Sequence, residues 1–334
     1  MNPIRLGIFK SNEIPQSFRV YAANIEKWLP ALGIEIIPFS GKKDLPGTAD
    51  LLWDIRSGGG NPPLEFMLDG PPLVMTVHGF APISLSGREY YGTLKGMLLS
   101  GRYSREKLAK WQELGDAVSG IIAVSDFTKA ETIRLTGVPA EKITVCHHGV
   151  DSESFSPSAH PDRGNYFLHI SNDEPRKNLA RIVQAFRKLR KSHDVELLLK
   201  LPAGVASRYS GIEGVKTIDR HLDKDELAAL YRNALGFVFP SLYEGFGLPI
   251  LEAMASGCPV ITSNASACPE VAGNAAWIVD PRNANALFEA MQSLFVDEDA
   301  RAMRIAAGLS RAASFSWQQS AACHVNAFRK AIEP

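Results

Sequence analysis

The sequence predicts an α/β protein made of two doubly wound halves. Its 334 residues are long for one core and sufficient for two domains of ordinary size. Short apolar runs alternate with longer segments of helical periodicity, which is typical of β-α units on a parallel sheet. Residues 151–165 are rich in Ser, Pro, Asp and Gly and have no periodicity. They are therefore predicted to link the halves, with a small-molecule site in the cleft between them.

In the first half, each apolar run is followed by polar, Gly-containing or His-containing residues, where a doubly wound sheet places its ligand-facing loops. A helix is expected over residues 20–32, because this segment has helical periodicity and ends at Gly33, a natural terminator. The strands of this half are expected at residues 4–9, 34–39, 51–55, 73–77, 121–124 and 143–146.

The same pattern restarts after residue 165 and predicts a second sheet. Its strands are expected at residues 166–170, 195–199, 215–218, 236–239, 259–262 and 276–279. Helices are expected at residues 178–192, 223–233 and 249–255, and from residue 284 onward.

Composition narrows the function classes. Lys plus Arg equals Asp plus Glu at 36 each, which argues against wholesale nucleic-acid binding. The four cysteines, Cys146, Cys258, Cys268 and Cys323, form no C-x-x-C pair, so we expect buried free thiols in a reducing compartment. Neither a signal peptide nor an apolar run long enough to span a membrane is evident. These features predict a cytoplasmic protein.

The most informative segment is the strand, loop and helix expected over residues 236–255. Gly245 and Gly247 let the backbone approach a ligand, and Pro249 is suited to the first turn of a helix. Free amides at a helix start suit an anion such as a diphosphate. Glu244 lies in the loop, and Glu252 is expected to project from about the first turn. By spacing alone, this diphosphate site and an ordinary strand–turn–helix are equally good interpretations.

A second segment, SNDEPRKN at residues 171–178, follows the first strand of the second half. Arg176 and Lys177 are placed there at the expected start of a helix. Cations at this end oppose the helix macrodipole, so they are poor choices for helix stability alone. A bound anion would resolve the conflict, while a solvated basic pair remains the alternative.

These segments carry a resemblance to a known family. Glu244 and Glu252 are separated by seven residues, within the sequence SLYEGFGLPILEAMA. This resembles the E-x7-E motif of retaining glycosyltransferases of family 4. The similarity continues through GCPVITSN at 257–264 and PEVAGNAA at 269–276, and is strongest from residue 166 to the end. It implies the GT-B fold, two Rossmann-like domains: residues 1–157 with a returning helix at 318–334 for the acceptor, and 158–317 for the donor.

The resemblance also implies roles for particular residues. Lys177 and Arg176 would contact the donor diphosphate, Glu252 the ribose, Glu244 the donor sugar, and His78 the reacting sugar. Many family members have Arg where this chain has Asn172, so Arg176 is a candidate replacement. The residues implied as catalytic are His78, Glu244 and Lys177, and those implied to bind the donor are Asn172, Arg176, Lys177, Glu244, Gly245, Phe246, Gly247, Leu248 and Glu252.

The function implied is transfer of a hexosyl group, with mannose or glucose favoured, from a GDP- or UDP-sugar to a hydroxyl in glycan or glycolipid assembly. The resemblance implies an enzyme that uses cationic side chains and helix dipoles in place of a catalytic divalent ion, so neither a metal ion nor another cofactor is expected. A sugar-nucleotide epimerase or hydrolase, and a catalytically silent nucleotide-sugar-binding protein, remain alternatives.

Residues 88–111 interleave basic side chains with apolar and aromatic ones. This pattern suits an interface-seeking surface that meets a lipid-linked acceptor at the inner face of a membrane. The alternative interpretation is an ordinary helix that covers the core and has a basic outer face.

Overall fold

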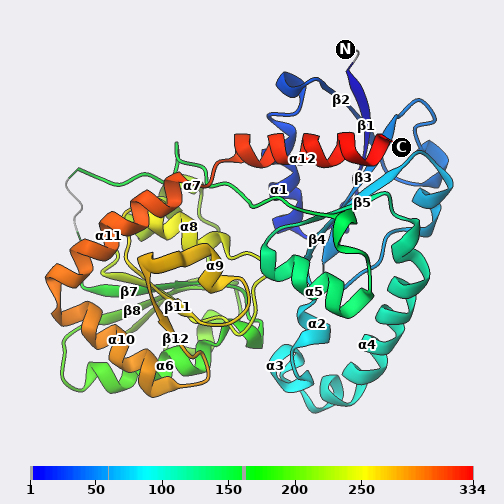
Figure 1. Ribbon diagram of the computed structural model, residues 1–334. Helices are drawn as coiled ribbons and strands as arrows, with labels where there is room; N and C mark the ends of the chain where they lie inside the picture. Colours follow the sequence, from blue (N-terminus) through cyan, green and yellow to red (C-terminus); the bar gives the residue numbers. More distant parts are fainter. Residues whose placement is uncertain (1–2, 59, 160–162, 334) are drawn as a thin grey trace. The chain divides into compact units, whose positions relative to one another are not determined.

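The computed structural model describes residues 3–58, 60–159 and 163–333 (Figure 1). Two compact units make up this part of the chain. Unit 1 comprises Met1–Gly87, Lys95–Gly149 and Phe315–Pro334, and unit 2 comprises Arg88–Leu94 and Val150–Ser314. Each unit contains one six-stranded sheet with helices, which confirms the predicted α/β class with two doubly wound halves.

The sheet of unit 1 has the order β2-β1-β3-β4-β5-β6, and every pairing in it is parallel. Parallel strands bring their carboxyl ends to one edge, so the ends of β3 and β4 are neighbours. Both strands run further than the apolar pattern indicated. The strands are β1 (Ile4–Phe9), β2 (Ile34–Phe39), β3 (Leu51–Gly58), β4 (Leu73–Gly79), β5 (Gly120–Ala123) and β6 (Ile143–Val145).

The prediction of one helix over residues 20–32 was wrong at both ends. The helix α1 (Gln16–Glu26) begins directly after Pro15, whose φ of −51° and ψ of 141° suit an N-cap, and Pro30 starts a separate 3-10 turn. The turn ends at Gly33 in the left-handed region, as expected. The other helices of unit 1 are α2 (Ala81–Ser84), α4 (Leu94–Leu114), α5 (Asp126–Thr136) and α12 (Trp317–Ile332), while α3 (Gly87–Tyr91) lies almost wholly in unit 2.

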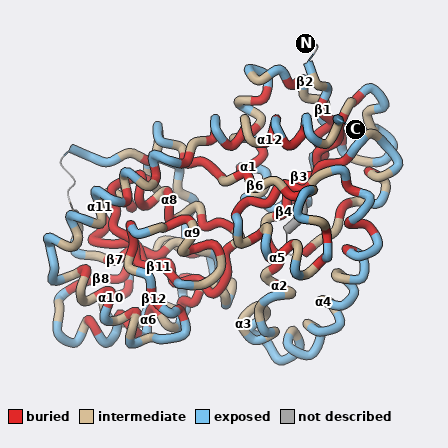
Figure 2. The backbone as a smooth tube through the Cα atoms, viewed as in Figure 1, coloured by how far each residue is buried: buried red, intermediate tan, exposed pale blue. Residues whose placement is uncertain are grey.

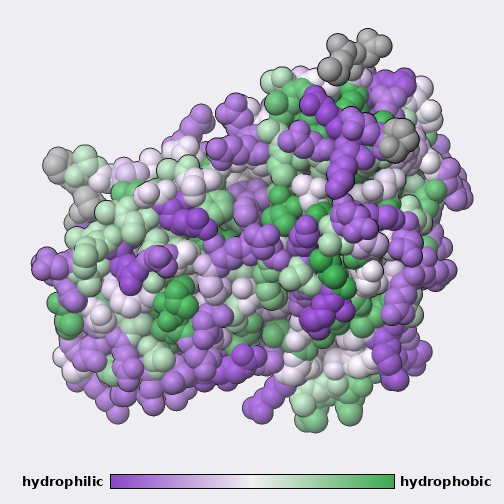
Figure 3. Space-filling view, in the orientation of Figure 1, coloured by the Kyte–Doolittle hydropathy of each residue, from purple (hydrophilic) through white to green (hydrophobic). Residues whose placement is uncertain are grey.

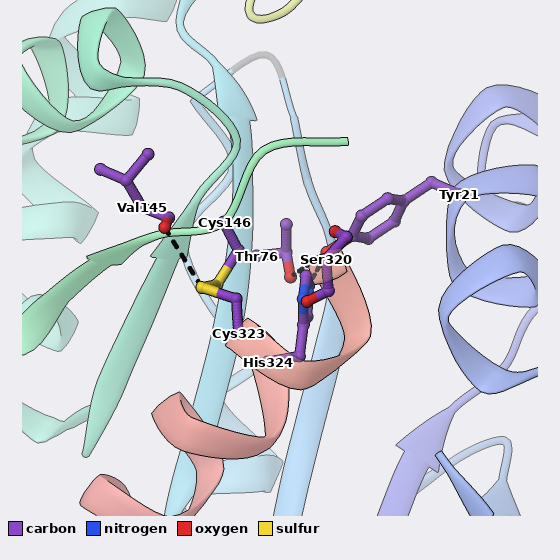
Figure 4. Close-up of a disulfide and its surroundings, with 7 residues drawn as sticks. All are labelled: Tyr21, Thr76, Val145, Cys146, Ser320, Cys323 and His324. Atoms are coloured by element: carbon purple, nitrogen blue, oxygen red, sulfur yellow. Dashed lines mark hydrogen bonds between the residues drawn. A yellow bond between two sulfur atoms is a disulfide. The ribbon is translucent and has the colours of Figure 1, made fainter. Parts of the chain in front are cut away.

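Helix α12 packs against the sheet of unit 1 through a buried chain of hydrogen bonds (Figure 4). His324 Nδ1 lies 2.7 Å from the Ser320 carbonyl, which only accepts, so this nitrogen carries the proton. Nε2 therefore accepts from the hydroxyl of Tyr21. Thr76 Oγ1 lies 3.2 Å from that hydroxyl and accepts from Trp53 Nε1 at 2.9 Å. Burial lowers the pKa of His324 to about 4, so the ring is neutral and this polarity is fixed.

The expectation of four free thiols was wrong for two of them. Cys146, directly after β6, forms a disulfide with Cys323 on α12, although 177 residues separate them in sequence (Figure 4). The sequence pattern could not bring these residues together, because only the packing of α12 beside β6 does so. Cys258 and Cys268 are free and buried, and burial raises the pKa of both thiols.

The sheet of unit 2 has the order β12-β11-β10-β7-β8-β9, again with parallel pairings throughout. Its central strands are buried on both faces, which explains their continuous apolar runs (Figure 2). The strands are β7 (Tyr166–Ile170), β8 (Glu196–Lys200), β9 (Val215–Ile218), β10 (Gly236–Phe239), β11 (Val260–Ser263) and β12 (Ala276–Val279). The helices are α6 (Leu179–Arg190), α7 (Lys224–Asn233), α8 (Leu248–Ala255), α9 (Cys268–Ala272), α10 (Ala284–Val296) and α11 (Glu298–Ala313).

The division between the units lies at Gly149 and Val150, before the predicted boundary between residues 157 and 158. The start of the expected linker already packs on unit 2. Asp151 pairs with Lys224 at 2.7 Å, and the ring of Phe155 lies 6.0 Å from that of Tyr231. Residues 160–162 of that linker lie outside the described residues. At the other end, the return to unit 1 begins at Phe315, before the predicted residue 318.

Candidate functional site

Lys177 and Arg176 converge on one carboxylate of unit 2. Lys177 Nζ lies 2.7 Å from Glu244 Oε1, and Arg176 Nη1 lies 3.2 Å from the same oxygen. Arg176 Nη1 also donates to the Tyr243 carbonyl at 2.9 Å. The two segments singled out in the sequence, 67 and 68 residues apart at these contacts, therefore form one site.

The local backbone explains how this convergence arises. Pro175, Arg176 and Lys177 form a 3-10 turn that precedes α6, so the cations lie before the helix rather than in its first turn. Asn178 follows in the left-handed region, with φ of 68°. Its side-chain amide donates to the carbonyls of Pro240 at 2.9 Å and Pro281 at 2.7 Å. Asn178 thus attaches the basic turn to the loop that carries Glu244.

The charges at this site determine the state of Glu244, whose residue is only 8% exposed. Burial alone would raise the pKa of its carboxyl group. The charges of Lys177 and Arg176 outweigh burial, so the pKa is held below its usual value. Glu244 is therefore ionised at neutral pH and cannot serve as a proton donor there.

The loop after Glu244 has the backbone geometry that its glycines predicted. Gly247 has φ of 109°, in the region that favours glycine, and α8 begins at the next residue. The Glu244 amide donates to Ser266 Oγ at 2.8 Å, and the Ala267 amide donates to the Glu244 carbonyl at 3.3 Å. Ser266 itself has φ of 54°. The loop Glu244–Leu248 is thus fixed from its first residue to the first turn of α8.

Glu252 lies on the second turn of α8, because the helix starts at Leu248. It was expected in about the first turn, and it lies one residue beyond that turn because α8 begins at Leu248 rather than at Pro249. The hydroxyl of Tyr231 on α7 donates to Glu252 Oε2 at 3.1 Å. Burial raises the pKa of this carboxyl group to about 7, and the bond from Tyr231 offsets only part of that effect.

Asn172 occupies the position at which many family 4 members have Arg. Its side-chain amide donates to Glu174 Oε1 at 2.6 Å, and Glu174 forms an ion pair with Arg176 Nε. Asn172 therefore acts on Arg176 through Glu174. Because Arg176 reaches the same carboxylate as Lys177, a second cation is present at the site despite the missing Arg.

His78 belongs to unit 1, at the end of β4. Its Nε2 lies 3.1 Å from the Ile55 carbonyl, so this nitrogen donates, and its ring stacks on Phe18 with centroids 3.9 Å apart. Burial lowers the pKa of His78 to about 3, which keeps the imidazole neutral. With Nε2 donating, Nδ1 is left as a hydrogen-bond acceptor.

Family models and known relatives match most of this chain. The family model "Glycosyltransferase Family 4" matches residues 58–154, and "Glycosyl transferases group 1" matches residues 164–297. The MMP alpha-(1->4)-mannosyltransferase of Mycolicibacterium hassiacum is 33% identical over 288 residues, covering 80% of this chain and 68% of that protein. This chain belongs to the family 4 glycosyltransferases.

The Escherichia coli O-antigen chain mannosyltransferase B is 32% identical over 253 residues, covering 68% of this chain and 64% of that protein. The family 4 chain thus spans somewhat less than two thirds of that relative, and 28% of the E. coli serotype-specific mannosyltransferase WbdA.

Solved structures show the same fold as this family 4 chain. A glycosyltransferase from Rickettsia africae has a TM-score of 0.74 at 16% identity, with both chains covered completely. The sucrose-phosphate synthase of Thermosynechococcus elongatus has a TM-score of 0.76 at 17% identity, with 98% of each chain covered. Anabaena HepE, solved in complex with UDP-glucose, has a TM-score of 0.71 at 16% identity, with 97% of this chain and 99% of HepE covered. These matches confirm the GT-B fold.

Sequence reasoning missed a cavity in unit 2 of this family 4 chain, beside the segment 171–178. It has a volume of about 210 Å³, lies at the carboxyl ends of β7 and β8, and is bordered on one side by Leu227 of α7. Its wall includes Leu227, one helical turn before Tyr231, so one face of α7 serves both the cavity and Glu252. No motif marks it, because its residues come from separate loops. It is lined by Ile170, Ser171, Lys200, Pro202, His221, Leu222 and Leu227.

Proposed function

We propose that the protein transfers a hexosyl group, with mannose or glucose favoured, from a nucleotide diphosphate sugar to an acceptor hydroxyl in glycan or glycolipid assembly, with retention at the anomeric carbon. The observation that carries this proposal is the convergence of Lys177 and Arg176 on Glu244 beside the loop that starts α8. The mannosyltransferase relatives favour mannose, and the HepE complex with UDP-glucose supports a nucleotide-sugar donor.

The two cations would stabilise the charge that develops on the departing diphosphate. When the bond from the anomeric carbon to the phosphate oxygen breaks, its electron pair stays on that oxygen. Lys177 and Arg176, which meet at Glu244, would share this charge, and the proposal requires neither a metal ion nor another cofactor. The acceptor hydroxyl forms the new bond and gives its proton to the departing phosphate.

Glu244 would hold the donor sugar rather than attack it. Two cations pair with its carboxylate, which reduces its nucleophilicity, and its lowered pKa keeps it ionised. A fixed negative charge at this place accepts hydrogen bonds from sugar hydroxyls. It also favours positive character at the anomeric carbon in an oxocarbenium-like transition state.

Glu252 would bind the ribose hydroxyls, with the base in the cavity at β7 and β8. Tyr231 orients the carboxyl group from α7, whose Leu227 lines the cavity. A base therefore has an apolar wall from Leu222 and Leu227 and polar groups from Ser171 and His221. GDP- and UDP-sugars are the favoured donors.

His78 would position the reacting sugar from unit 1. Because its pKa is low and its Nε2 donates to Ile55, Nδ1 is available to accept from a sugar hydroxyl. Stacking on Phe18 fixes the plane of the ring.

A lipid-linked acceptor would be met at the start of α4. Met97, Leu98 and Leu99 are 43%, 81% and 52% exposed, and Leu94 is 79% exposed. Figure 3 shows apolar residues at the lower edge of the view, where Figure 1 places the start of this helix. The buried residues of α4 are Trp111 and Leu114, both near its carboxyl end. The first turns therefore do not cover a core, and their exposed apolar side chains with neighbouring cations suit the surface of an anionic membrane.

Every helix within the described ranges is too short or too polar to span a bilayer. Peripheral contact is tested by flotation with anionic vesicles at low and high salt. Leu98→Glu should abolish binding and Leu85→Ala should not, because Leu85 lies outside this exposed surface. Equal flotation of wild type and Leu98→Glu would contradict membrane contact through α4.

The reaction is tested by incubating the protein with GDP-mannose, UDP-glucose and related donors in the absence of acceptor. We expect slow release of the nucleoside diphosphate, with the freed hexose initially in the anomeric configuration of the donor by NMR. Inverted hexose would contradict retention. A new nucleotide sugar would indicate an epimerase, and binding without turnover would indicate a silent binding protein.

A further inference from the structure

Unit 1 contains a larger cavity, of about 640 Å³. Its lining includes none of the residues proposed to bind the donor. It lies between the loops that follow β2 and β3 and one face of α4. Its volume is in the range of small-molecule sites. It is lined by Lys42, Arg56, Asn61, Pro62, Pro63, Leu64, Glu65, Phe66, Asp69, Lys107 and Lys110.

Two of the four cations at this cavity have carboxylate partners on its rim. Lys42 pairs with Asp69 at 3.2 Å, and Lys110 pairs with Glu65. All four of these side chains are more than half exposed. These pairs neutralise the charge of the rim. Arg56 and Lys107 are therefore the cations of the cavity that are available to a ligand.

Arg56 is held rigidly and is largely buried, at 18% exposure of its side chain. Its Nε lies 3.3 Å from Asp54, which is fully buried, and its Nη2 donates to the Pro62 carbonyl at 2.9 Å. The guanidinium plane is thereby fixed before any ligand arrives. A preset planar donor of this kind suits an oxyanion with several oxygens.

Lys107 is the second cation of the cavity. Its ammonium donates to Asn61 Oδ1 and lies 5.2 Å from the Tyr103 ring centroid. Within the described ranges no carboxylate forms an ion pair with it. Burial and the charge of Arg56 lower its pKa. Asp54 balances the charge of Arg56, so Lys107 is the cation that lacks an acid of its own, and a bound anion would stabilise its charged form.

We propose that this cavity binds the phosphate or diphosphate group of a second ligand, distinct from the nucleotide-sugar donor, through Arg56 and Lys107. Two cations of different geometry, one a planar fork and one a point charge, are suited to the several oxygens of a phosphate. This inference does not depend on the proposed transfer reaction.

The position of Lys107 favours a soluble phosphorylated ligand over a bilayer headgroup. Lys107 follows the exposed Leu98 by nine residues on α4. At about 100° per residue, this places it on roughly the opposite side of the helix. The cavity therefore does not share the helix face that carries the most exposed apolar side chain.

The proposal is tested by titrating the full-length chain with inorganic pyrophosphate in a calorimeter. Lys177→Ala weakens binding at the donor site, where Arg176 remains, so the class of binding that keeps its affinity in this variant reports on the cavity. In this background Lys107→Ala should weaken pyrophosphate binding by at least about tenfold, and Lys107→Arg should keep it within a few-fold. Arg105→Ala removes a charge from the same helix away from the cavity and should have no effect.

Thermal midpoints of all variants show whether each one is folded. A pyrophosphate class that Lys177→Ala removes completely, or one that Lys107→Ala leaves unchanged, would overturn the proposal. Vesicles of phosphatidic acid identify the source of the ligand. If Lys107→Ala abolished vesicle binding as well, the phosphate would belong to a lipid headgroup; we expect vesicle binding to be unchanged.

Discussion

Lys177 is the residue whose removal tests the donor site most directly. Lys177→Ala should lower kcat by about 100-fold, because one charge that stabilises the departing diphosphate is lost. Lys177→Arg should retain more activity than Lys177→Ala. Lys191→Ala, an exposed lysine just after α6, is the matched control and should be neutral. The measurement is the rate of nucleoside diphosphate release, and an unchanged rate in folded Lys177→Ala would exclude the proposed role.

Glu252 gives the stability of the chain a specific pH dependence. The pKa of its carboxyl group is about 7 in the folded chain, against 4.5 for a glutamate in water. Between these values the folded chain holds one more proton than the unfolded chain. The free energy of unfolding therefore falls as pH rises through this window, by up to about 1.4 kcal/mol per pH unit.

Glu252→Gln keeps an acceptor for Tyr231 and removes the titration. Urea unfolding at several pH values from about 5 to 7.5 should give a flatter profile for Glu252→Gln than for wild type. Profiles of equal slope would show that Glu252 does not titrate in this range.

At the residue scale, the sequence predicted the charged side chains of the site but not the residues that position them through hydrogen bonds and ion pairs. Lys177 and Glu244 stand in short motifs with a clear electrostatic meaning, so spacing and chemistry sufficed. Glu174 pairs with Arg176 because the chain bends between Asn172 and Arg176. Ser266 accepts a hydrogen bond from the Glu244 amide while its own backbone has a positive φ. Hydrophobic periodicity contains no information on such backbone geometry.

At the scale of elements, Asn178 joins the basic turn, α6 and the loop after β10. Asn178→Ala removes two buried hydrogen bonds and places a Cβ residue without a polar side chain at φ of 68°. We expect a loss of about 2–4 kcal/mol in the free energy of unfolding of unit 2. Asn178→Gly relieves the backbone but not the lost bonds, so its loss should be smaller. Chemical denaturation measures both, and equal stability of Asn178→Ala and wild type would contradict this role.

The strands were more predictable than the helix ends. A strand buried on both faces needs a continuous apolar run, and β7 and β10 appear at the expected residues. The start of α1 was missed because Pro15 acts as its cap, ahead of the first apolar residues of the periodic segment. Propensity locates an element well, while the local backbone decides its first and last residues.

At the scale of the whole molecule, the disulfide makes a countable prediction. In the oxidised chain, two cysteines should react with iodoacetamide after unfolding, and all four after reduction. Reduction should also lower the free energy of unfolding by about 2–5 kcal/mol, because Cys146 and Cys323 close a long loop. Mass spectrometry counts the modified thiols. Four reactive thiols without reductant would show that this bond is absent.

The two-unit organisation was predictable because the β-α pattern stops and restarts in the sequence. The exact division was not, since Asp151 and Phe155 have the composition of a linker segment and yet pack on unit 2. Arg88–Leu94 likewise belongs to unit 2, where Glu89 pairs with Arg282 at 2.7 Å. Such long-range pairs are invisible to local patterns.

The placement of α12 has a consequence for synthesis on the ribosome. Val150–Ser314 is translated before α12, so unit 2 has its residues while unit 1 still lacks the helix that accepts from Tyr21. The surface of the N-terminal sheet around Trp53 therefore stays uncovered until α12 has been synthesised. The half that is translated first is therefore the half that completes its folding last.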